Sequence, residues 1–293
     1  MRKILLMILL LPSLGLLFGQ QYRIISSRNG RDISLNELAK QLNRYDLIFF
    51  GEIHDDTALH EIQAQVLSAL HRRQSRLIVS FEMFERDVQS WIDSYLAGEI
   101  AEAEFLHESR PWSNYETDYR PLLEFAKSNH LKVLAANIPR QIASQVVRYG
   151  TNSLAELSEE ERGWIAEQIT ATPGDYKERF LQTMQLDMAH GEPGDQNVMD
   201  RLFYAQCMKD DTMAESIVQA LRANPRHKLI HFNGDFHSRA FLGTVERVRS
   251  RHPRARIAVI SPEYTENLAG FSFDPALRSE ADFLIVKTEE AGH

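Results

Sequence analysis

Short hydrophobic runs alternate with longer amphipathic stretches along most of the 293-residue chain, and this alternation constrains the fold more than any other feature. The runs have the length and residue types of buried strands, and the stretches between them repeat with helical periodicity. Strands that alternate with helices pair in parallel and are covered by helices on both faces. We therefore predict an α/β fold with a mainly parallel sheet.

The alternation places each element. The predicted strands are residues 46–50, 77–81, 131–135, 228–232 and 257–260. The predicted helices between them are residues 60–73, 86–96, 119–129, 139–149 and 239–251. Each strand is followed by a polar turn and then by a helix, as in a repeated βα unit.

Residues 150–224 interrupt this rhythm, because they contain no run typical of a strand. Helical stretches are predicted at residues 158–170, 175–190 and 195–222. We predict a smaller all-helical domain at residues 150–224, inserted into an α/β domain formed by residues 20–149 and 225–293.

Two local patterns support the helical interpretation of the insertion. Ser158 is followed three residues later by a glutamate, which is the capping box of a helix start. Tyr176, Phe180, Met184 and Met188 recur at steps of four and form one apolar stripe. Such a stripe is most simply the core of a helical bundle.

The first residues indicate export. Arg2 and Lys3 precede an uncharged run of 15 residues, 4–18, which is typical of a secretory signal peptide. The run is shorter than the roughly 20 residues that span a bilayer. We therefore expect residues 1–19 to be removed and the mature protein to be periplasmic or secreted.

Composition excludes several classes of protein. The formal net charge is -8 at pH 7, which disfavours binding to nucleic acid. Cys207 is the single cysteine, so the chain has neither an internal disulfide framework nor a Cys-rich metal site.

Two Gly-x-x-His elements carry the strongest signal of a site. Gly51-Glu52-Ile53-His54 follows the strand at 46–50, and Gly234-Asp235-Phe236-His237 follows the strand at 228–232. Ligand sites of open α/β sheets gather beyond the carboxyl ends of the strands. In each element the acid and the imidazole are two residues apart, so an extended backbone points both to one side. We predict that the two elements lie side by side in one polar site.

Other strands deliver polar residues to the same rim. Glu82 follows the strand at 77–81, and Asn137 and Arg140 follow the strand at 131–135. Two histidines with several carboxylates suit a divalent transition metal such as zinc, manganese or iron. The candidate ligands are Glu52, His54, Glu82, Asp235 and His237. No compact local metal signature accompanies them.

Longer strings in the chain resemble the ChaN-like haem-binding proteins of bacterial iron uptake. This family belongs to a superfamily with the Tiki proteins, the TraB proteins and the erythromycin esterases. The resemblance rests on the two Gly-x-x-His elements, Glu82, and residues 112–115, 119–121, 135–140 and 205–215. It implies a large α/β domain, a small helical domain and haem between them. It also implies that pairs of molecules enclose haems at a shared face, and that the partners are periplasmic or outer-membrane components of iron uptake.

The resemblance directs attention to the helical insertion as the haem site. Haem requires an apolar slot, an axial ligand and cations for its propionates. The stripe of Tyr176, Phe180, Met184 and Met188 is the candidate lining of the slot. The candidate axial ligands are Tyr176, His190 and Tyr204, and the candidate cations are Arg179 and Arg201. Some relatives are lipoproteins, but Gln20 stands here where their lipid-bearing cysteine follows a glycine, so lipid anchoring is not supported.

Two functions therefore compete, and a scaffold for another periplasmic component, with a purely structural rim, is the fallback. The first is an exported haem-binding protein in iron acquisition. The alternative is a metal-dependent hydrolase, in which Glu52, His54, Glu82 and His237 hold a metal and activate water, and Arg140 steadies an anionic intermediate.

Overall fold

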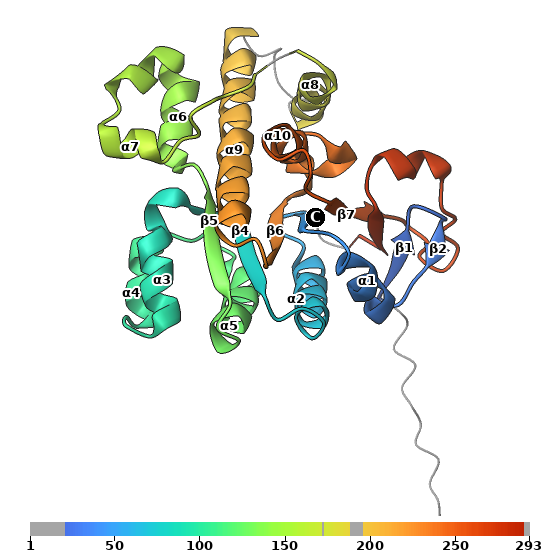
Figure 1. Cartoon of the computed structure of the whole chain (residues 1–293). Coiled ribbons are helices and arrows are strands. Elements are labelled where there is room, and N and C mark those ends of the chain that lie inside the picture. Colours follow the sequence, from blue (N-terminus) through green and yellow to red (C-terminus); the bar gives the residue numbers. More distant parts are fainter. Residues whose placement is uncertain (1–20, 172, 188–195, 290–293) are drawn as a thin grey trace, which may run out of the picture.

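The computed structural model describes residues 21–171, 173–187 and 196–289, which form a mixed sheet flanked by helices (Figure 1). Within these residues the sheet has eight strands in the order β2-β1-β8-β7-β3-β6-β4-β5. The strands from β8 to β5 are parallel, whereas β1 is antiparallel to both β8 and β2. The predicted α/β class is confirmed.

The strands begin close to the predicted positions but run further at their carboxyl ends. They are β1 (Tyr22–Ser26), β2 (Arg31–Asp32), β3 (Leu47–Glu52), β4 (Leu77–Glu85), β5 (Lys132–Asn137), β6 (Lys228–Gly234), β7 (Ile257–Tyr264) and β8 (Phe283–Lys287). The extensions carry polar rim residues that a hydrophobic run does not include. The sequence pattern missed β1, β2 and β8, because none of them is followed directly by a long helix.

Helices cover both faces of this sheet. They are α1 (Leu35–Leu42), α2 (Thr57–His71), α3 (Gln89–Ala97), α4 (Glu102–Ser109), α5 (Arg120–Ser128), α6 (Arg140–Tyr149), α7 (Glu159–Gly163), α8 (Asp175–Asp187), α9 (Gln196–Ala223) and α10 (Thr244–Arg251). Short helical turns lie at Arg86–Val88, Tyr115–Tyr119, Thr151–Glu156, Asp235–His237, Arg239–Phe241 and Pro275–Ser279.

Alternation along the central strand β3 divides the core into two layers. Ile48 and Phe50 pack with α1 to α5 on one face, and Leu47 and Phe49 pack with α9 and α10 on the other. A strand buried on both faces reads as a continuous hydrophobic run, which is why this segment was predictable.

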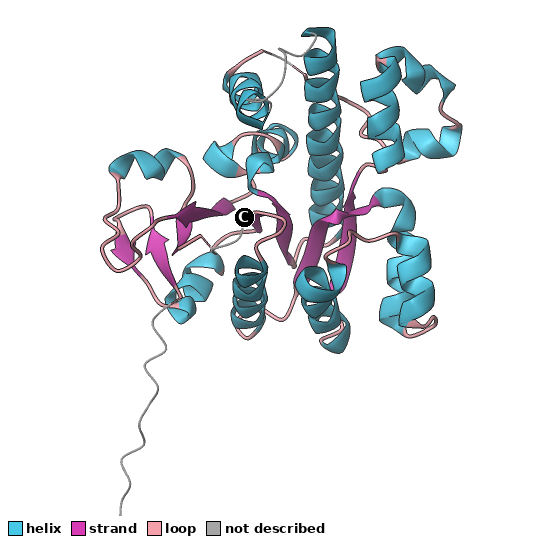
Figure 2. Ribbon diagram, turned by 180° about the vertical axis from the view of Figure 1, so that it is seen from behind, coloured by secondary structure: helices cyan, strands magenta, loops and turns pink. Residues whose placement is uncertain are grey.

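Helix α9 joins the sheet to the inserted region. Its carboxyl-terminal half packs on the sheet through residues such as Ile217, while its amino-terminal half extends past the sheet (Figures 1 and 2). There Met208 packs with α6, and Phe203 packs with Tyr176 and Phe180 of α8. Helix α9 therefore packs both on the sheet and in the smaller hydrophobic clusters formed with α6 and α8.

Two helix predictions need correction. The capping box at Ser158 is confirmed, but the helix it starts, α7, ends at Gly163 rather than at residue 170. The later backbone N–H groups donate to α9 instead: Ala166 to the Thr212 hydroxyl at 3.2 Å and Thr170 to the Asp211 carboxylate at 2.7 Å. The helix predicted from residue 239 begins only at Thr244.

The late start of α10 has a backbone cause. Ala240, Phe241 and Gly243 have φ angles of 58°, 59° and 54°, which lie outside the right-handed helical region. The chain therefore makes an irregular turn after His237 before the helix can begin.

Asp211 ties α9 to the elements on either side of it. Its carboxylate is fully buried and accepts hydrogen bonds from the Thr170 N–H, from Arg247 at 3.1 Å and from Arg251 at 2.6 Å. Arg247 is itself buried. Loss of the carboxylate would therefore leave this buried guanidinium with only Glu246, which is 46% exposed, as an ion-pair partner.

We expect Asp211→Ala to lower the free energy of unfolding by about 3–5 kcal/mol, the usual cost of breaking a buried ion pair. The matched control is Asp46→Ala, because Asp46 pairs with the exposed Arg256 at 2.6 Å. That change should cost about 1 kcal/mol or less. Urea denaturation of the three proteins measures both values. Equal losses in the two variants would contradict the role given to Asp211.

Candidate functional site

The two Gly-x-x-His elements lie side by side, as the sequence predicted. Strands β3 and β6 pair in parallel with Gly51 opposite Asn233 and Glu52 opposite Gly234. Both glycines are needed for this approach. A Cβ on Gly51 would lie 2.2 Å from the Asp235 carboxylate, and one on Gly234 would lie 2.9 Å from the His54 ring.

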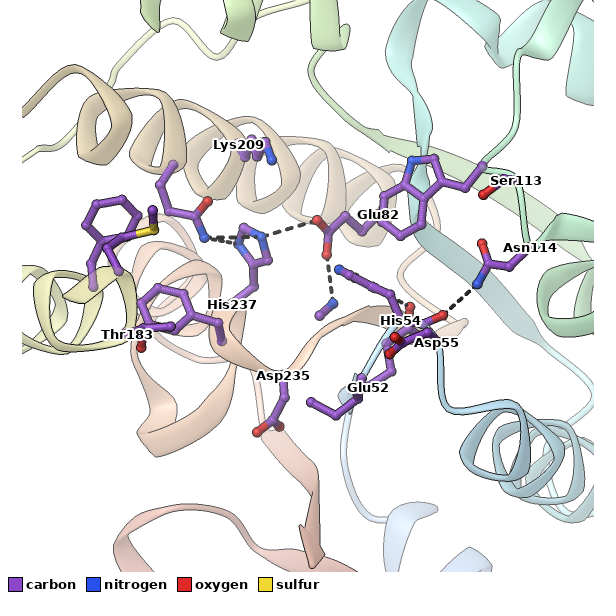
Figure 3. Close-up of a pocket in the computed structure, with 17 residues that line it drawn as sticks. Glu52, His54, Asp55, Glu82, Ser113, Asn114, Thr183, Lys209, Asp235 and His237 are labelled. Atoms are coloured by element: carbon purple, nitrogen blue, oxygen red, sulfur yellow. Dashed lines mark hydrogen bonds and ion pairs between the residues drawn. The ribbon is translucent and has the colours of Figure 1, made fainter. Parts of the chain in front are cut away.

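The elements open onto a pocket of about 850 Å³, which we call the rim pocket (Figure 3). Its walls come from the strand ends, from the segment before α5, and from α8 and α9. It is lined by Glu52, Ile53, His54, Asp55, Glu82, Trp112, Ser113, Asn114, Phe180, Thr183, Met184, Gln206, Lys209, Gly234, Asp235, Phe236 and His237. This size is within the range of small-molecule and cofactor sites.

A buried carboxylate holds the His54 ring. Glu52 is 2% exposed and accepts hydrogen bonds from the Tyr119 hydroxyl, from Gln63 at 2.7 Å and from His54 Nδ1 at 3.1 Å. Because a carboxylate can only accept, Nδ1 carries a proton, and in the neutral ring Nε2 presents its lone pair.

The other ring nitrogen of His54 is available to a ligand. The side chain is 46% exposed, and Nε2 makes no hydrogen bond to any described residue. Trp112 packs edge-on against the ring, with 4.6 Å between the ring centres. Burial would lower the pKa of His54, but the hydrogen bond to Glu52 and the charge of Glu82 raise it.

His237 is locked between two acids. Nδ1 contacts Asp210 of α9 at 2.7 Å, and Nε2 contacts Glu82 of β4 at 3.2 Å. Burial alone would lower the pKa of His237, but these carboxylates raise it to about 9. The same contact keeps the pKa of Glu82 well below its usual range, against the effect of burial. His237 is therefore an imidazolium that donates from both nitrogens and has no lone pair for a metal.

Asn137 and Arg140 have structural partners, whereas one oxygen of Asp235 has none among the described residues. Burial raises the pKa of Asp235 to about 6, and its Oδ1 has no hydrogen-bond partner among the described residues. Asn137 donates to the backbone oxygen of Glu82 at 3.1 Å. Arg140 lies outside the rim pocket and bonds to Glu85 at 2.9 Å.

This arrangement offers no support for the predicted divalent metal. Within the part of the chain that the structure describes, no three His, Cys, Asp or Glu side chains are grouped as metal ligands. Glu52 and Glu82 are already occupied by Tyr119, Gln63 and His237.

Only some of the residues proposed from the sequence for haem line the rim pocket. Phe180 and Met184 line the rim pocket. The Tyr176 hydroxyl donates to Asp210 at 2.5 Å, and burial raises the pKa of Tyr176 well above its usual value. Arg179 pairs with Glu280 at 2.7 Å. Tyr204 and Arg201 do not line the rim pocket, and Met188 and His190 lie outside the described residues.

Several pocket residues were missed as candidates. Phe236 lies within the second Gly-x-x-His element, and Gln206 and Lys209 lie three residues apart on α9. Residues with this spacing share a helix face. Two polar side chains on one face of an otherwise packed helix were the available signal, but the sequence does not say that this face borders a cavity.

The state of His237 generates a pH prediction. Because its folded pKa of about 9 exceeds the unfolded value of about 6.5, its ion pairs stabilise the fold fully below about pH 6.5. That stabilisation, on the order of 3 kcal/mol, is lost as the pH rises through about 9. NMR titration of the His237 ring should give a midpoint near 9, lowered by about one unit or more in Asp210→Asn. A wild-type midpoint at or below about 6.5 would contradict the buried imidazolium.

The sequence profile described as "Haem-binding uptake, Tiki superfamily, ChaN" matches residues 38–248. No curated protein sequence matches significantly.

One of three similar solved structures, that of ChaN, shares the fold of this chain. ChaN of Campylobacter jejuni, whose structure shows cofacial haem binding, is 18% identical, with a TM-score of 0.69 over 90% of this chain and 96% of that chain. An erythromycin esterase variant in its open conformation is 12% identical, with a TM-score of 0.49 over 92% and 83% of the two chains. The type III effector HopBA1 is 11% identical, with a TM-score of 0.47 over 87% and 94%. The profile match covers well over half of the chain, so the protein belongs to the ChaN family of haem-binding uptake proteins in the Tiki superfamily.

Proposed function

We propose that this protein binds haem in the rim pocket and passes it on during iron acquisition, with His54 as the axial ligand of the iron. One observation carries the proposal: the His54 imidazole, fixed by Glu52, faces a pocket whose walls include Phe180, Met184 and Phe236. The family is one of haem-binding uptake proteins, and its Campylobacter jejuni relative binds haem cofacially.

The donor set of the rim pocket fits haem. A histidine ligand of a metal almost always donates its other ring N–H to a carboxylate or carbonyl, as His54 does to Glu52. An apolar wall suits the faces of a porphyrin, and Trp112 adds aromatic surface beside the imidazole. Bound haem would supply a Lewis-acidic iron, which His54 would bind through Nε2. The role of the chain is to orient one nitrogen ligand and to shield the ring from water.

We propose His54 in place of Tyr176 and Tyr204, two of the axial ligands expected from the sequence; the third, His190, lies outside the described residues. The hydroxyl of Tyr176 is buried and donates to Asp210, so it would have to lose a charge-assisted hydrogen bond to reach iron. Tyr204 lines neither the rim pocket nor the cavity next to it. The phenylalanine and methionine of the α8 stripe keep the role proposed for them as an apolar wall.

The proposal also covers the location of the protein, its domains and its pairing. We propose that residues 1–19 direct export and that the mature protein works in the periplasm or outside the cell. Residues 150–224 form the smaller domain that closes one side of the haem site, and two copies pair across the open side of the rim pocket. No helix of the described residues is long and apolar enough to cross a membrane.

Titration with ferric haem tests the proposal. The wild-type protein should give a saturable Soret shift and the spectrum of a histidine-ligated iron. His54→Ala should lose that spectrum and weaken binding by roughly tenfold or more, and Glu52→Gln should weaken it less, because Glu52 acts through the orientation of the ring. Added imidazole should restore the spectrum of His54→Ala.

Tyr204→Phe is the matched control, because its hydroxyl does not line the rim pocket. It should bind haem as the wild type does. Absence of saturable binding by the wild type would refute the haem site. Unchanged binding and an unchanged spectrum in His54→Ala would move the axial ligand to another residue.

The Glu52–His54 pair also favours a second function. A solvent-accessible imidazole with an unpaired nitrogen, oriented by a carboxylate, is the arrangement of a general base. Such a protein would hydrolyse an ester or amide without a protein-bound metal. Hydrolysis of a panel of esters by the wild type, abolished in His54→Gln, would support it, and no turnover by the wild type would exclude it for that panel.

A further inference from the structure

Two polar residues of α2, His60 and Gln63, are buried behind His54. They lie three residues apart in the first two turns of the helix, so their side chains share one face. They are 2% and 0% exposed, and neither lines the rim pocket. Buried polar side chains bind other protein groups, and the partners of these two lead back to His54.

The Gln63 side chain joins Glu52 to His60. Its amide nitrogen donates to Glu52 Oε2 at 2.7 Å, because a carboxylate can only accept. Its amide oxygen therefore faces the other way and accepts from His60 Nδ1 at 2.9 Å. The second oxygen of the same acid, Glu52 Oε1, accepts from His54 Nδ1 at 3.1 Å.

The other nitrogen of His60 returns to the backbone of His54. Nε2 donates to the His54 carbonyl oxygen at 3.2 Å, and Asn114 Nδ2 donates to the same oxygen at 2.5 Å. A carbonyl oxygen has two lone pairs, so these two donors satisfy it. Four hydrogen bonds thus form a closed cycle, which runs from the His54 side chain through Glu52, Gln63 and His60 to the His54 carbonyl. We call it the His54 cycle.

The His54 cycle is complete when both nitrogens of His60 carry a proton, because each of them faces an acceptor. Two carboxylates favour this form: Glu52 Oε2 lies 3.8 Å from Nδ1, and Asp118 Oδ2 lies 4.0 Å from Nε2. Hydrogen bonds in a buried network of this kind strengthen one another. The cycle therefore holds the side chain and the backbone of His54 as one unit.

The beginning of α2 is itself fixed to the sheet. Asp56 is the N-cap of the helix, and its carboxylate accepts from Lys287 of β8 at 2.6 Å and from the Tyr264 hydroxyl of β7 at 2.6 Å. Asp56 and Lys287 are both buried. Two strands therefore help to fix the turn of helix from which His60 and Gln63 reach toward His54.

We infer that His60 and Gln63 position His54 for its ligand, by holding its side chain through Glu52 and its backbone through the carbonyl oxygen. They do not touch the ligand themselves. Their effect is that His54 Nε2 already faces the rim pocket when the ligand arrives, so less conformational freedom is lost on binding. This inference rests on the proposed function and adds two positioning residues to it.

The variants separate the two halves of the His54 cycle. In His60→Asn the amide nitrogen takes the place of Nδ1 and keeps the bond to Gln63. In His60→Gln it takes the place of Nε2 and keeps the bond to the His54 carbonyl, and His60→Leu loses both. The matched control is His71→Leu, because His71 ends the same helix, packs on Phe125 and does not line the rim pocket. Circular dichroism and thermal unfolding first compare each variant with the wild type.

The first measurement needs no haem. In the unliganded wild type, NMR should detect the proton on His54 Nδ1, because the bond to buried Glu52 slows its exchange with water. His60→Leu should speed this exchange by about tenfold, the effect of losing roughly one net hydrogen bond. His60→Asn and His60→Gln should each speed it less, and His71→Leu should leave it unchanged.

The second measurement is the affinity for ferric haem in two backgrounds. In the otherwise wild-type protein, His60→Leu should weaken binding by about tenfold, as loss of an outer partner of a metal ligand does. In His54→Ala supplied with imidazole, the same change should have no effect, since no His54 is left to position. Equal weakening in both backgrounds would overturn the inference, because it would indicate a general loss of the shape of the pocket.

The two proposals fail in different ways. Unchanged exchange of the His54 proton in both His60→Leu and Gln63→Met would overturn the inference, whether or not haem binds. Absence of saturable haem binding by the wild type, together with faster exchange in His60→Leu, would overturn the proposed function and leave the positioning of His54 intact. If His60→Leu does not fold, His60→Asn and His60→Gln serve in the same two measurements.

Discussion

The close parallel pairing of β3 and β6 at their carboxyl ends is the constraint on which the site depends. A side chain larger than hydrogen at Gly51 or Gly234 would collide with Asp235 or with the His54 ring. The two glycines therefore let two acid-x-His elements, separated by most of the sequence, occupy one rim. The other residues that line the rim pocket surround these two strand ends.

Charge pairing then gives the two histidines different chemistry. His237 has a carboxylate at each ring nitrogen and is held as an imidazolium, whereas His54 has one carboxylate and keeps a free nitrogen toward the pocket. Similar sequence contexts thus produce one structural cation and one candidate ligand. The difference comes from Asp210 on α9, a residue that neither element contains.

These relations explain what could be predicted from the sequence. The buried strands and the meeting of the two elements follow from hydrophobic runs and from the rule that sites lie at strand ends, which are local properties or properties of the fold class. The charge of His237 depends on Asp210 of α9. The same acid binds the Tyr176 hydroxyl, and Glu280 binds Arg179, so neither side chain is free for a ligand. Such pairings join segments far apart in the chain, so periodicity could place the stripe of α8 but could not show which of its polar neighbours were already occupied.

Asp210 and Asp211, adjacent residues of α9, bind side chains on two different sides of the helix. Adjacent residues on an α-helix point about 100° apart, because 3.6 residues make one turn. Asp210 therefore faces the site and bonds His237 and Tyr176, while Asp211 faces Arg247 and Arg251. The bond to Tyr176 is consequential, because Phe180 and Met184 follow Tyr176 at steps of one helical turn. The Tyr176 hydroxyl therefore ties the first turn of α8, and with it the helix that carries the apolar wall, to the same carboxylate that contacts His237.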